Sequence, residues 1–374
     1  MSTKKVDVAA HSITLTRARD LVRELVLEGS GEGLKLLILG PPGLGKSAAM
    51  RQAAAAYAKV IGLPLHDSVD GPPTAQAFGI CETIWSQFDP SDLRFPALDA
   101  ASGDYTFRYS SELPLVGNES RFPTRGVWVH DEVTNVEPFL QKILMQVILE
   151  GRIGARRVLP GWRQVAAGNR MADSMLVAPL AVPLANRFVH ATVVADIDAW
   201  IDWAFESGVD PLVIAFLKNR PNLLHAFNSS HHAAGQYASP TPRSWECVSR
   251  QCLPLSEPSK SDAIIGSVGI GPATEFLSWA KVKDEMPDLE RIRNGKGSKT
   301  ERIPSRPDAL VATAIALVHI SDDNSLPHVV EYVLRMPREF QKLWSVDLPR
   351  KAKRLLLHPA FRTWVTAHAV GGSK

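Results

Sequence analysis

The sequence lacks the long apolar runs that would direct it to a membrane, and we expect no secretory signal. Its most apolar stretches, MLVAPLAVPLA (175–185) and ALVATAIALVHI (309–320), are shorter than the roughly 20 residues that a transmembrane helix needs, and prolines interrupt the first. The first twelve residues, MSTKKVDVAAHS, have no apolar core and are not typical of a secretory signal. We therefore expect a cytoplasmic protein without a membrane partner.

Cysteine is also scarce, because the chain has only three, Cys81, Cys247 and Cys252. An odd count without a secretory signal points to a reducing compartment rather than to a disulfide framework. Cys247 and Cys252 could form half of a metal site, but no second pair of ligands is evident in the sequence. Buried structural thiols are the favoured interpretation.

Charge of one sign is not in large excess either. The formal net charge is +3, which is too small to indicate a nucleic-acid partner by itself. The remaining composition, 45% hydrophobic and 22% charged over 374 residues, is that of an ordinary globular protein with room for two or three domains.

The first half of the chain alternates strand-like and helix-like segments. Continuous apolar runs such as LKLLILG are typical of central parallel strands, and alanine-rich or amphipathic segments follow them. This pattern predicts a three-layer α/β domain with a parallel sheet. The expected strands are 34–40, 127–131, 163–169 and 188–194, and the main expected helices are 47–62 and 137–151.

Strand patterns stop near residue 195, and the segments after it have the patterns of helices. The segment NGKGSKTERIPSRP (294–307) is polar, basic and rich in helix breakers, which indicates a loop or linker. A last helical segment follows it.

The octapeptide GPPGLGKS (40–47) satisfies the P-loop pattern between an apolar strand and a helix. Glycines let such a loop turn tightly, so that its backbone N–H groups point at phosphate oxygens, and the following helix N-terminus adds partial positive charge. We expect Lys46 to reach the β and γ phosphates of ATP and Ser47 to ligate Mg²⁺. The residues predicted to bind the nucleotide are Gly40, Pro42, Gly43, Leu44, Gly45, Lys46, Ser47 and Ala48.

Two adjacent carboxylates end the strand-like segment VWVHDEVTN (127–135). Carboxylates resist burial unless they are paired or bind a cation. Beside a P-loop, Asp131 is the expected second Mg²⁺ ligand, and Glu132 is placed to orient or deprotonate the attacking water. An acidic helix cap is the alternative for these two residues, and the P-loop makes it the weaker one.

Two further polar residues are candidates for the same site. Asn169 ends the segment RQVAAGN, so a parallel sheet would bring it to the edge at which the nucleotide lies, although a turn asparagine fits as well. Arg187, in PLANRF, is either an arginine finger for a neighbouring subunit or a cap of the preceding helix.

In this order, GPPGLGKS, VWVHDEV, AAGN, LANRF and SPTPRS resemble the AAA+ ATPases, and within them the MoxR-like group, over about residues 15–250. The resemblance implies that Asn169 is the sensor 1 residue, that Arg187 is the trans finger, with Arg170 as the other candidate, and that Arg243 is the sensor 2 arginine facing the γ-phosphate. The sequence departs from the pattern of the group at Arg170, where a proline is usual, and at the inserted proline of SPTPRS. It further implies a homo-hexameric ring.

The resemblance also divides the chain into an AAA+ core (1–195), a helical lid (196–290) and a basic helical C-terminal extension (291–374). Two β-hairpin inserts are expected, near 93–114 and 151–161. In the first, Tyr105, Phe107 and Tyr109 alternate with polar residues, and SGD supplies a turn. These aromatics either face the substrate side of the ring or pack on the sheet.

Three functions remain open from the sequence. The favoured one is an ATPase ring that remodels or activates a protein client, for which the MoxR-like resemblance implies a partner with a von Willebrand factor A domain. The second is a nucleic-acid motor or a nuclease-associated ATPase, suggested by arginines around 151–163 and by PRKAKR (349–354). Such charges are more often a solvated face or contact an acidic protein. A P-loop kinase is the third and weakest, because kinases do not need the Asp131–Glu132 pair.

Overall fold

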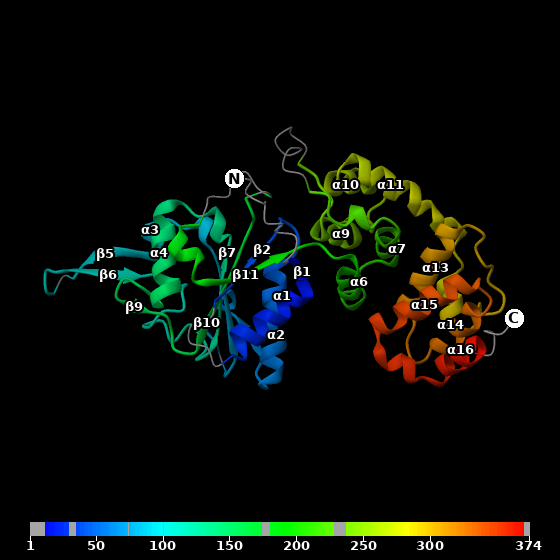
Figure 1. The fold of residues 1–374 in the computed structure, drawn as a ribbon, viewed down its shortest axis with the longest axis horizontal. Coiled ribbons are helices and arrows are strands. Elements are labelled where there is room, and N and C mark those ends of the chain that lie inside the picture. The colour runs from blue at the N-terminus through cyan, green and yellow to red at the C-terminus, as the bar shows by residue number, and fades with distance from the viewer. Residues whose placement is uncertain are drawn as a thin grey trace, which may run out of the picture. The chain divides into compact units, whose positions relative to one another are not determined.

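The computed structural model describes residues 12–29, 35–73, 75–99, 101–171, 173, 180–227 and 237–369. The chain divides into two compact units, Met1–Val194 and Ala195–Lys374, and each is described by itself (Figure 1). Residues 174–179, where the first apolar run begins, lie outside the described residues.

The N-terminal unit is built on a seven-stranded sheet in the order β1-β11-β2-β10-β7-β4-β3, in which every described pair of neighbours is parallel. The strands are β1 (Ser12–Ile13), β2 (Lys35–Leu39), β3 (Leu65–Asp67), β4 (Phe78–Ile84), β7 (Gly126–Asp131), β10 (Trp162–Gly168) and β11 (Phe188–Val193). The strand that leads into the P-loop and the strand that ends in the two acids are therefore separated by one strand, β10.

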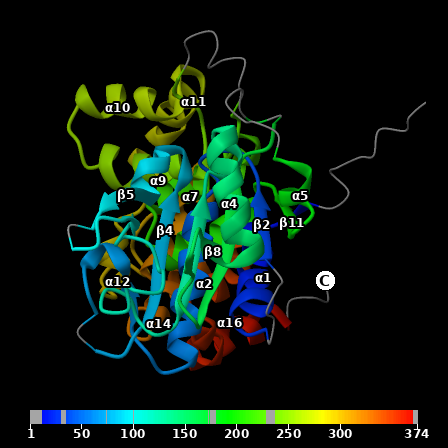
Figure 2. The same cartoon turned by 90° about the vertical axis from the view of Figure 1, so that its left-hand side faces the viewer.

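Helices cover both faces of this sheet, which gives the three layers seen in Figure 1 and Figure 2. Side chains alternate between the two faces of a strand. Leu37, Trp128 and Ala166 lie on one face and pack in a single cluster with Leu140 and Leu144 of α4 (Pro138–Glu150). The opposite face is covered by α2 (Lys46–Val60), together with α1 (Leu15–Leu21) and the π-helical turn η2 (Val22–Leu27). The three-layer α/β fold with a parallel sheet that is expected from the sequence is confirmed.

Two hairpins extend the unit beyond its sheet. β5 (Arg94–Leu98) and β6 (Tyr105–Tyr109) pair antiparallel and form the long arm that projects from the sheet unit in Figure 1. β8 (Arg152–Ile153) pairs with β9 (Arg156–Arg157). The hydroxyl of Tyr109 accepts a hydrogen bond from the Ala155 N–H at 3.0 Å, so the base of the arm contacts the second hairpin. The unit also contains two short helices, α3 (Pro90–Leu93) and α5 (Val182–Ala185).

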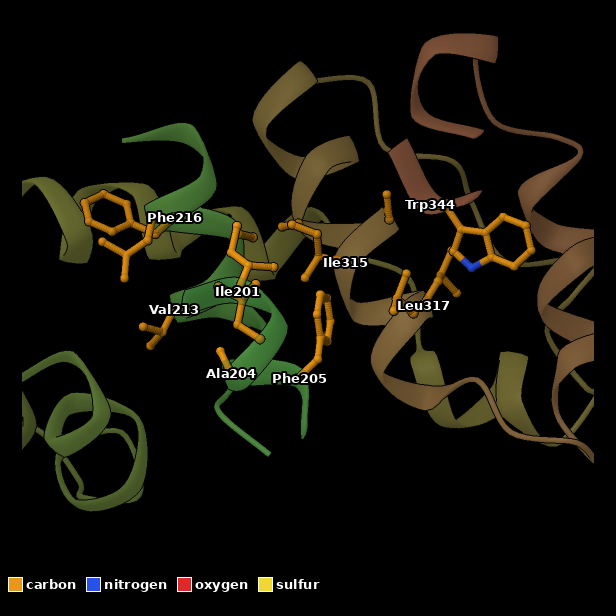
Figure 3. Packing of buried hydrophobic residues seen from close by; sticks show 14 of the residues in the cluster. Ile201, Ala204, Phe205, Val213, Phe216, Ile315, Leu317 and Trp344 are labelled. Atoms are coloured by element: carbon orange, nitrogen blue, oxygen red, sulfur yellow. The ribbon is translucent and has the colours of Figure 1, made fainter. Parts of the chain in front are cut away.

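Every element of regular structure among the described residues of the C-terminal unit is a helix. One hydrophobic cluster runs through it, from Ile201 and Phe205 through Phe216 and Ile315 to Trp344 (Figure 3). Residues 196–290 and 291–369 thus share a core. The helices are α6 (Ile197–Glu206), α7 (Pro211–Asn219), α9 (Pro242–Cys247), α10 (Ser259–Val268), α11 (Ile270–Ala280), α12 (Leu289–Arg293), α13 (Pro307–Ile320), α14 (Leu326–Val333), α15 (Arg338–Lys351) and α16 (Pro359–Ala369).

The apolar run 309–320 forms most of α13, whose side chains are buried in this core. The expected loop at 294–307 is present over 294–306, because α13 begins at Pro307. Arg335 holds this loop by donating to the carbonyl oxygens of Ser298 at 2.9 Å and Glu301 at 2.8 Å. Among the described residues, no helix combines the length and apolar character needed to cross a bilayer.

Candidate nucleotide-binding site

The P-loop connects β2 to α2 at the carboxyl edge of the sheet. Gly45 precedes the helix with φ 97°, a left-handed conformation that side-chain-bearing residues rarely adopt. A Cβ atom at Gly40 would lie 2.9 Å from the carbonyl oxygen of Val193, so only glycine fits there without a shift. The two glycines allow the loop to turn sharply and to lie close to the neighbouring strand.

The first turn of α2 faces this loop without a side-chain cap among the described residues. The first four N–H groups of a helix have no partner within it, and together with the helix dipole they attract anions. α2 is 15 residues long. Its N-terminus can therefore supply the N–H donors that a phosphate requires.

Lys46 is only 9% exposed and folds back over the loop. Its Nζ donates hydrogen bonds to the carbonyl oxygens of Gly40 at 2.8 Å and Pro41 at 3.0 Å, and to Oδ1 of Asn169 at 2.9 Å. The ammonium is thus held between the P-loop and the end of β10, where a phosphate oxygen can replace some of these acceptors.

Asn169 reaches this position because β10 lies between β2 and β7. Its backbone N–H donates to Oγ1 of Thr134 at 2.8 Å, which fixes the chain where it leaves the strand. The structure therefore brings Asn169 to Lys46, as parallel-strand geometry predicts.

Ser47 and Asp131 meet across the site. The Ser47 hydroxyl donates to Oδ2 of Asp131, and Oδ1 of Asp131 accepts the N–H of Glu132 at 2.7 Å. A hydroxyl and a carboxylate oxygen side by side are hard oxygen donors of the kind that Mg²⁺ prefers. The two predicted metal ligands are therefore in contact in the structure.

Glu132 adopts a left-handed backbone conformation, with φ 54° and ψ 31°. This is uncommon outside glycine, and such strain is concentrated at functional sites. Its Oε2 accepts a hydrogen bond from the hydroxyl of Ser86, which follows β4. The carboxylate proposed to act on water is therefore tied to the neighbouring strand.

Ser86 and Thr134 were not found by sequence reasoning, although each holds a predicted site residue. Ser86 follows the strand FGICETI (78–84), which the sequence pattern did not predict, so its position at this sheet edge was not predicted either.

His130, beside the two acids, is fully buried in the sheet. Its Nδ1 accepts from the Trp85 indole N–H at 3.0 Å, so the proton lies on Nε2, which faces Oε1 of Gln164 at 3.2 Å. Burial, against the opposing effect of the hydrogen bond to Gln164 and with a smaller contribution from the charge of Lys35, lowers the pKa of His130 to about 3. The imidazole is therefore neutral and positions strands rather than transferring protons.

The three arginines differ in their surroundings. Arg170 forms a two-point ion pair with Asp173, in which Nε donates to Oδ2 at 2.5 Å and Nη2 donates to Oδ1 at 2.8 Å. This pairing raises the pKa of Arg170. Arg187, directly before β11, is exposed and has no partner among the described residues. Arg243 is exposed in the first turn of α9, in the other unit.

The remaining P-loop residues and the arm also have clear positions. Leu44 is buried and Ala48 exposed. On the arm, Tyr105 is 78% and Phe107 52% exposed, whereas Tyr109 contacts the second hairpin. The aromatics of the arm therefore do not pack on the sheet, apart from Tyr109 at its base.

No protein-family model and no curated protein matches the sequence. Among solved structures, similar chains include NtrX from Brucella abortus with ADP, at 14% identity and a TM-score of 0.36, over 90% of this chain and 67% of that one. NtrX with ATP matches at 14% identity and 0.35, over 93% and 70%. Closed-state Hsp104 with ATPγS and FITC casein matches at 14% identity and 0.34, over 54% of this chain and 37% of Hsp104. These scores are too low to carry an argument about function.

Proposed function

We propose that this chain is a Mg²⁺-dependent ATPase of the AAA+ class, similar to the MoxR-like group, and that it works as a ring on a protein client. The observation that carries the ATPase assignment is the convergence of five side chains at one sheet edge. These are Lys46 and Ser47 of α2, Asp131 and Glu132 at the end of β7, and Asn169 at the end of the neighbouring strand β10.

The residues present fit both ATP and Mg²⁺. The uncapped start of α2 and the buried ammonium of Lys46 suit a chain of phosphates. The Ser47 hydroxyl and the Asp131 carboxylate would hold Mg²⁺, because they are hard oxygen donors already in contact. When bound there, Mg²⁺ would neutralise charge that develops on the phosphate oxygens.

Glu132 would act as the base, since its carboxylate lies beside the pair and is not needed for the metal. The hydrogen bond from Ser86 takes up part of the acceptor capacity of Oε2, so losing this bond would make Oε2 more available to a proton from water. Asn169, held by Thr134, would orient the water or the γ-phosphate from the other side.

The proposal of a ring is supported by the exposed arginines and by the family resemblance. Arg187 would enter the site of the next subunit, which explains an arginine with no partner among the described residues of its own chain. Arg243 would contact the γ-phosphate of its own subunit. A homo-hexamer, a partner with a von Willebrand factor A domain and a remodelled client complete the proposal.

A nucleic-acid motor is the second candidate, favoured by one observation. Arg156 and Arg157 are exposed on the second hairpin, next to an arm with exposed aromatic rings. Cationic and aromatic side chains together are typical of single-strand binding. Arg156 is partly engaged, however, since it donates to the Val116 carbonyl oxygen at 2.8 Å. We therefore favour the protein client.

Glu132→Gln tests the ATPase assignment. The amide keeps the shape of the carboxylate but cannot take a proton, so kcat should fall by about 10²–10⁴-fold while ATP affinity stays unchanged. Hydrolysis would be followed by phosphate release and binding by a fluorescent ATP analogue. Full hydrolysis by this variant would contradict the assignment.

The same variant tests the client. With ATP it should remain assembled and retain bound protein, which mass spectrometry of the purified complex would identify. Stimulation of the wild-type ATPase by single-stranded DNA at physiological salt separates the two candidates. Stimulation of tenfold or more would replace the protein remodeller by the nucleic-acid motor.

A further inference from the structure

Two of the three cysteines lie on one helical turn of the C-terminal unit. α9 continues into a π-helical turn, η7 (Val248–Cys252), where the Leu253 N–H donates to the Val248 carbonyl oxygen at 2.9 Å. A π-helical turn joins residues five apart, whereas an α-helical turn joins residues four apart. Cys247 and Cys252 are five apart, so this turn places them one above the other on the same face.

Both sulfurs face the same hydroxyl on the neighbouring helix α10. The Oγ of Ser267 lies 3.8 Å from Sγ of Cys247 and 3.5 Å from Sγ of Cys252. The Ser267 hydroxyl donates to the Ala263 carbonyl oxygen at 2.8 Å, which fixes its position. Two thiols from one turn thus converge on one point between α10 and η7.

The pair is open on one side. Cys252 is 2% exposed, and burial is the main reason that its pKa is raised, with a direct interaction with Cys247 adding to the rise. Cys247 is half-buried, and its thiol donates to Oε1 of Gln251 at 3.4 Å. The more exposed side of the pair is therefore the side of Cys247 and Gln251.

Simple distances decide what can join the two sulfurs. Side chains three or four residues apart on an α-helix have Cβ atoms about 5–6 Å apart, and a π-helical turn brings residues five apart into the corresponding position. A disulfide needs about 3.8 Å between its Cβ atoms, so it would distort the turn. A single metal ion with two sulfur bonds of about 2.3 Å each spans up to roughly 4.6 Å between sulfurs, which suits parallel side chains.

The ligands that the described residues provide favour one class of ion. Among the described residues, no group of three or more His, Cys, Asp or Glu side chains could hold a metal. Structural zinc requires four ligands, and Ca²⁺ or Mg²⁺ requires oxygen. Thiolate pairs select soft ions, of which Cu(I) is the biological example.

We propose that Cys247 and Cys252 form a two-thiolate site for one soft, thiophilic cation of the cuprous class, positioned by Ser267. Binding releases the two thiol protons to solvent and forms two sulfur–metal bonds, with no change of oxidation state. The pair is more than two structural thiols because the π-helical turn, rather than the core packing alone, aligns them.

The test is a titration of the full chain with Cu(I) against a competing chromogenic Cu(I) chelator under reducing, anaerobic conditions. Wild type and Cys81→Ser should each bind one ion per chain, since Cys81 is buried in the other unit. Cys247→Ser should lower the affinity at least about a hundredfold, because one of two ligands is lost. Ser267→Ala should lower it by about tenfold.

Because Cys252 is buried, Cys252→Ser is informative only if its thermal melting matches that of wild type, whereas the half-buried Cys247 gives a variant expected to fold. Native mass spectrometry would give the stoichiometry. Unchanged affinity in Cys247→Ser, an equal loss in Cys81→Ser, or one ion shared by two chains would each overturn the proposal.

Discussion

Two groups of residues proposed for ATP hydrolysis are organised to different degrees. Around the P-loop, Lys46 bonds to Asn169 and Ser47 bonds to Asp131, so these groups hold one another before any ligand binds. By contrast, the proposed arginines Arg187 and Arg243 are exposed, and the side chain of Arg187 has no partner among the described residues. The first group is preorganised by contacts within the N-terminal unit, whereas the proposed roles of the two arginines require contacts that their own units do not supply.

Among these variants, Lys46→Ala should cause the largest loss of ATP affinity. It removes a buried ammonium, and charge-assisted hydrogen bonds of about 1.5–3 kcal/mol each correspond to a loss of ATP affinity of about a hundredfold or more. Isothermal titration with ATP and Mg²⁺ would measure it. Lys59→Ala, at an exposed position of the same helix, is the matched control and should bind normally. Normal binding by Lys46→Ala would show that the loop does not hold the phosphates.

Arg187→Ala tests whether Arg187 acts on the ATP that is bound to a neighbouring subunit. We expect kcat to fall by about 10³-fold with ATP affinity retained, because a trans finger acts on the transition state. Mixing this variant with Glu132→Gln should restore part of the activity, since some interfaces would then have both groups intact. Arg170→Ala is the comparison, because Arg170 is already paired with Asp173. If Arg170→Ala shows the larger loss of kcat and Arg187→Ala does not, the finger is Arg170.

Arg243→Ala should have a smaller effect, on binding rather than turnover. The loss of one charge-assisted contact to the γ-phosphate predicts about tenfold weaker ATP binding, with ADP binding unchanged. The ratio of ATP to ADP affinity is the measurement. Arg250→Ala is the control, since Arg250 is paired with Glu246 at 2.9 Å. An equal loss of affinity for ATP and ADP would show that Arg243 does not contact the γ-phosphate.

Ser86→Ala should have the smallest effect, and it should raise the rate of ATP hydrolysis rather than lower it. Releasing the Glu132 carboxylate from its hydrogen bond, worth about 0.5–1 kcal/mol, predicts a two- to fivefold rise in basal hydrolysis. Ser86→Thr keeps the hydroxyl and should behave as wild type. A fall in rate with Ser86→Ala would mean that Ser86 orients Glu132 for catalysis instead of restraining it.

The sequence predicted the parts of the site that combine a motif with its context. GPPGLGKS between an apolar strand and a helix, and two acids at a strand end, have few other interpretations. Parallel-strand geometry then placed Asn169 correctly beside Lys46. The alternating aromatics and the SGD turn likewise predicted the β5–β6 arm.

Other features could not be predicted because they depend on contacts between distant segments. β1 and β3 have two and three residues, too few to show a period, and β4 has no alternation that distinguishes it. Ser86 acquires its partner only when β4 and β7 pair. The π-helical turn between Cys247 and Cys252 leaves no mark on the pattern of apolar residues.

The polar contacts inside the sheet have a consequence for folding. Trp85, His130 and Gln164 are linked across the ends of β4, β7 and β10, and the Trp128 indole N–H donates to Thr83 at 2.8 Å. A one-residue slip of any of these strands would leave several buried donors and acceptors unpaired, at about 1–3 kcal/mol each. Apolar side chains alone would tolerate such a slip more easily. The aromatic and amide groups therefore act as a register lock, which makes the alignment of Lys46, Asp131 and Asn169 a property of the folded sheet itself.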